Sequence, residues 1–190
     1  MKKVLLTISL SALIFSCTKK NETVAETSEE SVKLTLAEDS LKAIAEETKM
    51  TLVKQLTKQI EDSGAAKAID FCHVNAIPLT QSVADKHGLK VYRVSDKNRN
   101  PDNAPSEEEL KVIEQYKQQL LAGEQLKPQK TDTHYYAPLV TNAMCLQCHG
   151  DKTNNLKPEV ASLISEKYPD DKAFGYKENE VRGLVVITSN

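Results

Sequence analysis

Cys145-Leu146-Gln147-Cys148-His149 is the segment of this 190-residue sequence that carries the most chemical information. Two cysteines separated by two residues and followed directly by histidine form the attachment pattern of a c-type haem. In that chemistry the two thiols add to the two haem vinyl groups, and the next residue places its imidazole on the iron. The motif therefore predicts one covalent haem c, attached through Cys145 and Cys148, with His149 as an axial ligand.

Two other sites use a similar cysteine pair. A closed zinc site needs a second pair of ligands at matching spacing, and the sequence contains no such pair. A thioredoxin-like redox site opens a helix within a βαβ unit, which the surrounding sequence does not resemble. We therefore favour haem over both alternatives.

The composition fits a globular domain that binds no nucleic acid. Hydrophobic residues make up 39% and charged residues 27% of the chain, and tryptophan is absent. These are ordinary proportions for a soluble domain. The formal net charge of −2 gives no sign of the basic surface that nucleic-acid binding requires.

The N-terminus predicts export. Residues 1–17 read MKKVLLTISLSALIFSC, a basic start followed by an apolar run that is short for a membrane span. Ile14-Phe15-Ser16-Cys17 resembles the cleavage site of a bacterial lipoprotein, in which Cys17 would become the lipidated N-terminus. Ordinary signal cleavage with an incidental Cys17 is the alternative. We expect a signal peptide over residues 1–16, a polar flexible tether over 17–33 and one domain over 34–190, lipid-anchored on the periplasmic side of a bacterial membrane or at the cell surface.

Hydrophobic periodicity within that domain predicts a mixture of helices and strands. The long first helix ends at the stop signal Ser63-Gly64, Pro78 falls in the first turn of a later helix, and Ser106 with Glu109 forms a capping box. Pro138 indicates an edge or irregular strand. We expect helices over 34–61, 65–71, 77–87, 106–122 and 158–168, and strands over 89–95, 133–140 and 182–188. The fold class predicted is α+β.

The order of several motifs resembles a known family. The motifs are Ala68–Cys72 (AIDFC), Tyr92–Ser95 (YRVS), Asn98–Pro105 (NRNPDNAP), Cys145–Gly150, Tyr168–Tyr176 (YPDDKAFGY) and Arg182-Gly183. This order is similar to that of a c-type haem family of unknown function whose cyanobacterial member has a PAS-like fold, and which has relatives among bacterial sensor domains. The resemblance covers residues 34–190. It implies a PAS-like antiparallel sheet flanked by helices, with a long N-terminal helix.

The resemblance also implies an unusual pair of iron ligands, His149 and the thiolate of Cys72. Judged by its local sequence alone, Cys72 is as well explained as a small buried hydrophobic residue. With the resemblance, ligation is the better interpretation. His73 follows directly and is a competing ligand, although it points about 100° away from Cys72 around a helix.

Other side chains are candidates for the surroundings of the haem. Charge-assisted hydrogen bonds to the propionates are expected from Arg93, Arg99, Asn100 and Asn103. The alternative is that the asparagines fix a turn and that Arg99 is solvated. Tyr135 and Tyr136 are expected either to pack on the porphyrin or to belong to the core. His87, His134 and Met144 are weaker candidates.

An iron held by two side chains has no vacant position for a substrate, so the sequence predicts no enzyme. We expect an exported mono-haem c-type cytochrome that acts in redox or gas sensing and passes its signal to an unknown periplasmic protein. The alternative is a periplasmic electron carrier, or an accessory electron-transfer subunit, with no sensing role.

Overall fold

The computed structural model describes residues 32–190. The predicted signal peptide, the lipidation site Cys17 and all but the last two residues of the predicted tether lie outside this range, and those assignments stay predictions. The elements in chain order are α1 (Glu38–His87), β1 (Lys90–Val94), η1 (Pro101–Asn103), α2 (Glu107–Leu121), β2 (Gln129–Lys130), β3 (His134–Val140), η2 (Ala143–Cys145), α3 (Leu146–His149), α4 (Pro158–Lys167) and β4 (Val181–Thr188). Within residues 32–190, none of the helices combines the length and the apolar character needed to cross a bilayer.

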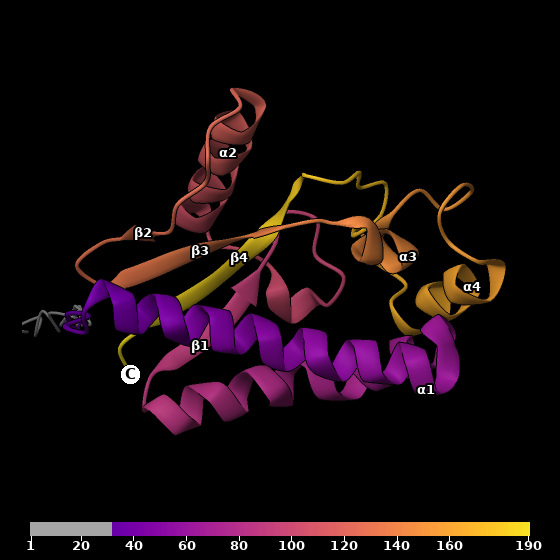
Figure 1. Ribbon diagram of the computed structural model, residues 1–190, viewed down its shortest axis with the longest axis horizontal. Helices are drawn as coiled ribbons and strands as arrows, with labels where there is room; N and C mark the ends of the chain where they lie inside the picture. The colour runs from indigo at the N-terminus through magenta and orange to yellow at the C-terminus, as the bar shows by residue number, and fades with distance from the viewer. Residues whose placement is uncertain (1–31) are drawn as a thin grey trace, which may run out of the picture. The chain divides into compact units, whose positions relative to one another are not determined.

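Four antiparallel strands form one sheet in the order β1-β4-β3-β2, with helices on both faces (Figure 1). Alternate residues of β4 point to opposite faces, as strand geometry requires. Val185 and Ile187 join the core beneath α1, whereas Leu184 and Val186 join the core beneath α2. The central strand is therefore buried on both faces. The predicted α+β class and the antiparallel sheet flanked by helices are confirmed.

The proline in β3 lies where the strand has only one partner. β3 pairs with β4 along its length, but β2 covers only Tyr135 and Tyr136. Pro138 falls beyond that short pairing, so its missing N–H removes no ladder bond on the open side. The prediction of an irregular strand is confirmed by a register shift between Leu139 and Val140.

Helix α1 folds back on itself at Gly64, whose φ of 82° and ψ of 165° are not helical. The residues before this turn and those after it form two antiparallel arms (Figure 1). Glu47 on the first arm binds Lys86 on the second, with 2.6 Å between Oε1 and Nζ. Leu41 and Ile44 share one core with Val83. The predicted helix stop at Ser63-Gly64 is confirmed.

The predicted break between residues 71 and 77 is wrong, because the second arm of α1 runs unbroken through Pro78. Pro78 offers no N–H to the carbonyl of Val74, four residues earlier. Val74 is 66% exposed, so water can satisfy that carbonyl. One turn away, the side-chain amide of Asn75 donates to the carbonyl of Phe71 at 2.9 Å. We attribute the tolerance of the proline to this exposure of Val74.

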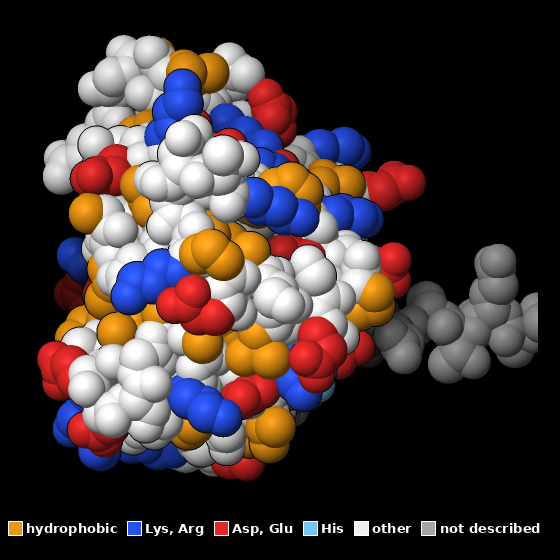
Figure 2. Space-filling model, turned by 90° about the vertical axis from the view of Figure 1, so that its right-hand side faces the viewer, with side chains coloured by type: hydrophobic (Ala, Val, Ile, Leu, Met, Phe, Trp, Pro, Cys, Tyr) orange, Lys and Arg blue, Asp and Glu red, His pale blue; other side chains and the backbone are white. Residues whose placement is uncertain are grey.

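Helices α3 and α4 lie beside the turn at Gly64, at one end of the sheet (Figure 1). Ile69 of α1, Val160 and Ile164 of α4, Leu156 and Tyr168 form a core of their own there. Seen from outside, hydrophobic side chains on this face form small groups among charged ones (Figure 2). This end of the molecule carries the cysteine motif.

Candidate functional site

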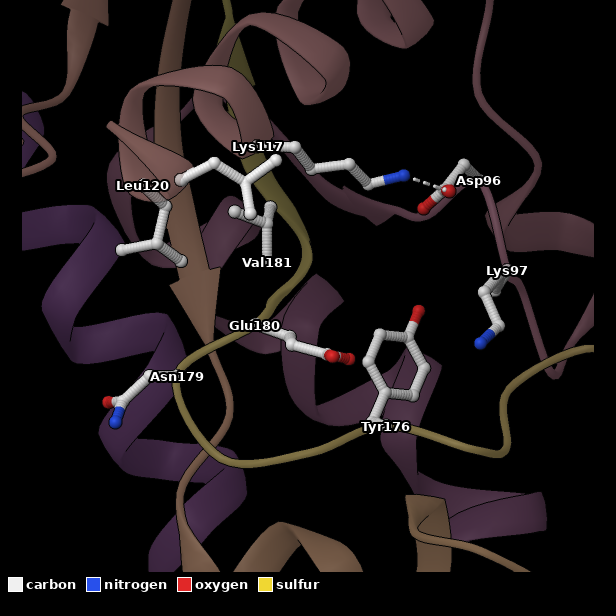
Figure 3. Close-up of a pocket in the computed structure, with 9 residues that line it drawn as sticks. Asp96, Lys97, Lys117, Leu120, Tyr176, Asn179, Glu180 and Val181 are labelled. Carbon is white, nitrogen blue, oxygen red and sulfur yellow. Dashed lines mark hydrogen bonds and ion pairs between the residues drawn. The ribbon is translucent and has the colours of Figure 1, made fainter. Parts of the chain in front are cut away.

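A cavity of about 280 Å³ opens beside α2 and the start of β4, lined in part by Asp96, Lys117 and Tyr176 (Figure 3). None of the predicted haem-binding residues lines it. Tyr176 connects this cavity with the cysteine motif, because its ring meets that of His149 nearly edge-on, with centroids 6.3 Å apart. The predicted site is therefore next to the cavity and separate from it.

Both cysteines of the motif lie on one tight turn formed by η2 and α3. The side-chain oxygen of Asn142 accepts hydrogen bonds from the backbone N–H groups of Met144 and Cys145, at 3.0 and 3.3 Å, and so begins the turn. The thiols of Cys145 and Cys148 are half-buried and free of disulfides. Cys148 packs against the core shared by α1 and α4.

His149 is oriented by a backbone carbonyl. Its Nδ1 lies 2.8 Å from the oxygen of Ala173. A carbonyl only accepts, so the Nδ1 atom carries the proton and the Nε2 atom keeps its lone pair. Burial, followed by the charges of Arg182 and Arg99, lowers the pKa of His149 well below its usual value. His149 is thus held neutral, in the form that binds a metal.

The segment 171–176 fixes the backbone around His149. The N–H of Tyr176 donates to the carbonyl of His149 at 3.0 Å, and the N–H of Gly175 donates to that of Gly150 at 2.9 Å. A Cβ atom at Gly150 would lie 2.6 Å from both the Leu146 carbonyl and the Asn155 side chain. Only glycine fits there without displacing its neighbours.

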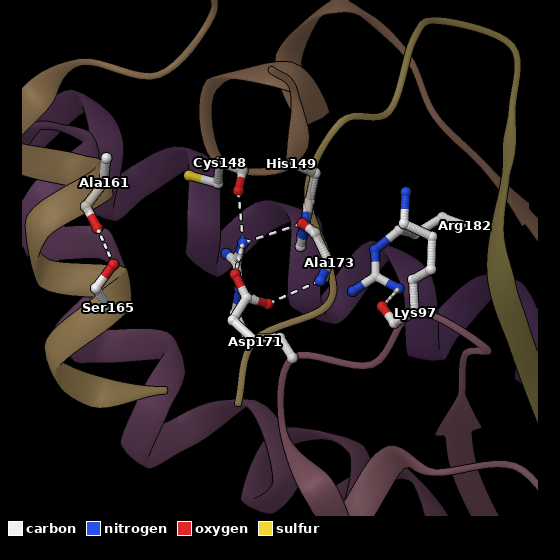
Figure 4. Close-up of polar contacts among 9 residues, drawn as sticks. Lys97, Cys148, His149, Ala161, Ser165, Asp171, Ala173 and Arg182 are labelled. Atoms are coloured by element: carbon white, nitrogen blue, oxygen red, sulfur yellow. Dashed lines mark hydrogen bonds and ion pairs between the residues drawn. The ribbon is translucent and has the colours of Figure 1, made fainter. Parts of the chain in front are cut away.

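Arg99 joins the cysteine motif to this segment, and its partners Cys148, Asp171 and Ala173 are labelled in Figure 4. Its guanidinium binds both carboxylate oxygens of Asp171 at 3.2 Å, and it donates to the carbonyl oxygens of Cys148 and Ala173 at 2.6 and 3.1 Å. The side chains of Arg99 and Asp171 are only 11% and 5% exposed. The predicted alternative of a solvated Arg99 is therefore wrong. Bidentate pairing gives this contact a fixed geometry.

Cys72 lies on the second arm of α1 and its thiol is half-buried and free of disulfides. Burial raises the pKa of the Cys72 thiol, while the charges of Arg93 and Arg99 act in the opposite direction. Burial also raises the pKa of Cys148, to about 11, with Arg99 opposing this and the charge of Cys72 adding to it. The Cys72 and Cys148 sulfurs therefore lie within electrostatic range of each other.

His73 points elsewhere. Its ring is exposed and meets the ring of Tyr168 edge-on, with centroids 5.0 Å apart. Of these two neighbours on the helix, Cys72 is half-buried and His73 is exposed.

A family model described as Tll0287-like matches residues 15–190. The chain belongs to the Tll0287-like family. Among solved structures it is similar to the crystal structure of the cyanobacterial heme-protein Tll0287, at 21% identity and a TM-score of 0.57, over 79% of this chain and 92% of that one. No curated protein matches. The resemblance found in the motif order is confirmed, and the two proteins share a fold.

Some of the residues predicted to surround the cofactor lie elsewhere in this Tll0287-like chain. Tyr136 is buried beneath α2, with its hydroxyl donating to Glu108 at 3.2 Å, and Tyr135 is buried on the opposite face beneath α1. Tyr136 is therefore a core residue, which is the alternative predicted for it, and it does not lie at the cysteine motif. Asn100 caps η1, its side-chain oxygen accepting from Asp102 N at 3.0 Å, as the turn-fixing alternative predicts.

The weaker candidates have ordinary structural contacts. His87 binds Glu47 at 2.8 Å, His134 stacks on Tyr136 with centroids 5.5 Å apart, and Met144 accepts a hydrogen bond from Thr57 at 3.7 Å. The sequence analysis missed three elements of the site: the carbonyl of Ala173, the ring of Tyr176 and the guanidinium of Arg182. A carbonyl has no sequence signature, but Tyr176 and Arg182 both occur in the motifs on which the resemblance rests.

Proposed function

We propose that this protein binds one haem c through thioether bonds from Cys145 and Cys148, with His149 and Cys72 as the axial iron ligands. The observation that carries the proposal is the hydrogen bond from His149 Nδ1 to Ala173, which leaves Nε2 available on a rigid turn. The similarity to a structure described as a heme-protein supports the same cofactor.

The residues at the site fit a covalent haem. The two free thiols of Cys145 and Cys148 lie on the same turn as the neutral imidazole of His149, and Cys72 supplies a third sulfur from α1. No group of three or more His, Cys, Asp and Glu side chains suited to a metal ion occurs within residues 32–190, whereas a closed zinc site needs four ligands. When bound, the haem supplies a one-electron couple between ferric and ferrous iron.

The role we propose is redox or gas sensing, in which a change at the iron releases Cys72. The support is the position of Cys72 on α1, between the Gly64 turn and Pro78, where one backbone hydrogen bond is already missing. A thiolate donates negative charge to iron, so a bond from Cys72 to a haem iron would be weaker in the ferrous than in the ferric protein. Release would free the second arm of α1 to shift and so pass a signal to a partner protein. We propose no enzymatic role, because in the resting protein both ligand positions would be filled by side chains of the chain.

Absorption and EPR spectra of the full-length protein test the ligands. The protein would be produced in a bacterium that attaches haem c, beside Cys72→Ala and the adjacent control His73→Ala. We expect covalent haem in all three proteins, and loss of the low-spin thiolate signature in Cys72→Ala alone. Unchanged spectra in Cys72→Ala, together with altered spectra in His73→Ala, would instead make the site bis-histidine.

The same proteins separate a sensor from an electron carrier. A sensor is expected to lose the Cys72 bond on reduction and to bind CO, with a change in protease sensitivity along the second arm of α1. Identical Cys72 ligation in ferric, ferrous and CO-treated protein would reject sensing and leave the carrier as the function.

Export and lipid anchoring are a further part of the proposal, supported by residues 1–17 of the sequence. Labelled fatty acid is expected to appear in the wild-type protein and not in Cys17→Ala, which would be released from membranes. Equal labelling of both proteins would reject Cys17 as the anchor.

A further inference from the structure

All three arginines of this chain lie close enough to the candidate site for their charges to affect the pKa of Cys72 or of His149. The sequence contains 25 lysines and arginines, of which only Arg93, Arg99 and Arg182 are arginines. The positive charges of Arg99 and Arg182 act to lower the pKa of His149, and those of Arg93 and Arg99 act to lower the pKa of Cys72. Arginine binds carboxylates through a planar fork and is more weakly hydrated than lysine, so it is favoured in partly buried anion sites. The three arginines therefore give this place the side chains that suit an anion-binding site.

Only one of the three has an acidic partner. Arg99 is neutralised by Asp171. Arg93 donates to the hydroxyl of Thr80 at 3.2 Å and to the carbonyl of Ala76 at 3.3 Å, both neutral acceptors.

Arg182, like Arg93, has neutral hydrogen-bond acceptors and no acidic partner among the described residues. Its Nη1 donates to the hydroxyl of Ser95 and, at 3.2 Å, to the carbonyl of Lys97, while its Nε has no partner. Its guanidinium also lies 5.3 Å from the centre of the Tyr176 ring. Across residues 32–190, no carboxylate lies within salt-bridge distance of Arg93 or Arg182.

This arrangement is electrostatically costly without an anion. Burial and the charge of Arg182 both lower the pKa of Arg93, and burial lowers that of Arg182. Two like charges without a counterion in a partly buried site destabilise the fold, whereas an anion between them would remove the cost. The bonds to Ser95 and Lys97 hold the Arg182 guanidinium, which lies beside the Tyr176 ring, and leave its buried Nε without a hydrogen-bond partner. Figure 4 shows Arg182 beside Lys97.

We infer that Arg93 and Arg182 form a carboxylate-binding pair that holds the propionate groups of the haem. The inference rests on the proposed function and extends it, since it assigns the anionic edge of the cofactor to β1 and β4. A small free anion has the same chemistry and is the competing source of negative charge. Arg99 is not included in this pair, because its guanidinium already binds both carboxylate oxygens of Asp171.

Reduction potentials of the haem-loaded, full-length protein test the pair. A cation beside the haem favours the more negative ferrous state, so its removal should lower the potential. At the potential where the wild type is half-reduced, we expect the ferrous-to-ferric ratio of Arg182→Gln and Arg93→Gln to fall at least about fivefold. A tenfold fall corresponds to about 59 mV. The propionate bands in the resonance Raman spectrum are expected to shift in the same variants.

Two further variants make the result specific. Arg182→Lys keeps the charge and loses the fork, so its potential should stay within about twofold of the wild-type ratio while the propionate bands shift. Lys117→Gln removes a lysine that already has a partner, Asp96. Neither the potential nor the propionate bands should change in Lys117→Gln.

Each outcome has a distinct meaning. Arg182→Gln with bound haem, wild-type potential and unshifted propionate bands would overturn the arginine pair and leave the proposed function standing. A wild-type protein without haem would overturn the proposed function, and the pair with it. A wild-type potential that moves with added sulfate, with propionate bands unaffected by Arg182→Gln, would assign the pair to a free anion and contradict the inference.

Discussion

The Nδ1 atom of His149 lies 2.8 Å from the carbonyl oxygen of Ala173, on a segment that follows the cysteine motif by more than twenty residues. Arg99 donates to the same oxygen at 3.1 Å. The Ala173 oxygen therefore accepts hydrogen bonds from both His149 and Arg99. The orientation of the imidazole thus depends on the contacts that fix the backbone of residues 171–173. Asp171 does this, since one of its oxygens accepts from the N–H of Ala173 at 2.9 Å while the carboxylate binds Arg99.

Replacing Asp171 with alanine should destabilise the protein by about 3 kcal/mol, because it leaves the nearly buried Arg99 without its counterion. It should also broaden the spectrum of the bound haem, since Ala173 loses its support. Urea unfolding and absorption spectra measure the two effects.

Asp170→Ala is the matched control for this change, because Asp170 is the exposed neighbour of Asp171. A surface substitution of this kind should alter the free energy of unfolding by no more than about 0.5 kcal/mol. Equal losses in the two variants would show that the Arg99–Asp171 pair contributes nothing specific.

The two glycines that bound the second arm of α1 should respond differently to asparagine. Gly64 has φ 82° and ψ 165°, a region open essentially to glycine alone, whereas Gly88 has φ 62° and ψ 34°, a left-handed conformation that asparagine also adopts. We expect Gly64→Asn to cost about 1–3 kcal/mol in unfolding free energy and Gly88→Asn clearly less. Similar costs at both positions would mean that α1 does not turn sharply at Gly64.

The contact between the arms of α1 should make stability depend on pH. Hydrogen bonds from Lys86 and His87 lower the pKa of Glu47 from its ordinary 4.5. A carboxylate whose pKa is lower in the folded state contributes stability above pH 4.5, and this is lost as the pH falls through the folded-state value. Glu47→Gln should therefore be less stable than the wild type at pH 7, and the difference should vanish in acid.

Urea midpoints measured between pH 3 and pH 7 check this, with Glu46→Gln as the control. Glu46 is an exposed neighbour that binds only Lys49, one turn away on the same arm. A pH-independent difference between Glu47→Gln and the wild type would show that the contact between the arms is not electrostatic.

The parts of the fold that follow from local sequence were predictable. Alternation of apolar and polar residues predicted β1, and the segments of β3 and β4 were also predicted to be strands, the second of them apolar throughout. The capping box of Ser106 and Glu109 is present at α2, with Ser106 N donating to the Glu109 carboxylate at 2.6 Å. The continuity of α1 through Pro78 was not predictable, because it depends on which carbonyl faces water. β2 is two residues long and has no periodicity to detect.

The candidate site was predictable only as far as its side chains carry a pattern. The spacing of Cys145, Cys148 and His149 was sufficient to identify the attachment motif, whereas Cys72 required the family resemblance. The pairing of Arg99 with Asp171 joins residues 72 positions apart, which spacing does not reveal. Arg182 had one detectable signal, its place among only three arginines.

Gly183 connects the sheet to the site and provides a final prediction. Its φ is 155°, and a Cβ atom there would lie 2.1 Å from the carbonyl oxygen of Val94 on the neighbouring strand β1. Gly183→Ala must therefore push β4 away from β1, next to Arg182. We expect it to destabilise the protein by about 2 kcal/mol or more and to shift the haem reduction potential as Arg182→Gln does.

The control for Gly183→Ala is Gly123→Ala, at the end of α2, where φ is 77° and a Cβ atom meets nothing within 4 Å. This variant bears only the backbone strain of a positive φ, about 1 kcal/mol, and it should leave the haem potential unchanged. If Gly183→Ala matched this control in both stability and potential, the close approach of β4 to β1 would have no part in placing Arg182. A large loss of stability with an unchanged potential would separate the two roles: Gly183 would serve the sheet, and the bonds to Ser95 and Lys97 would be enough to position the guanidinium.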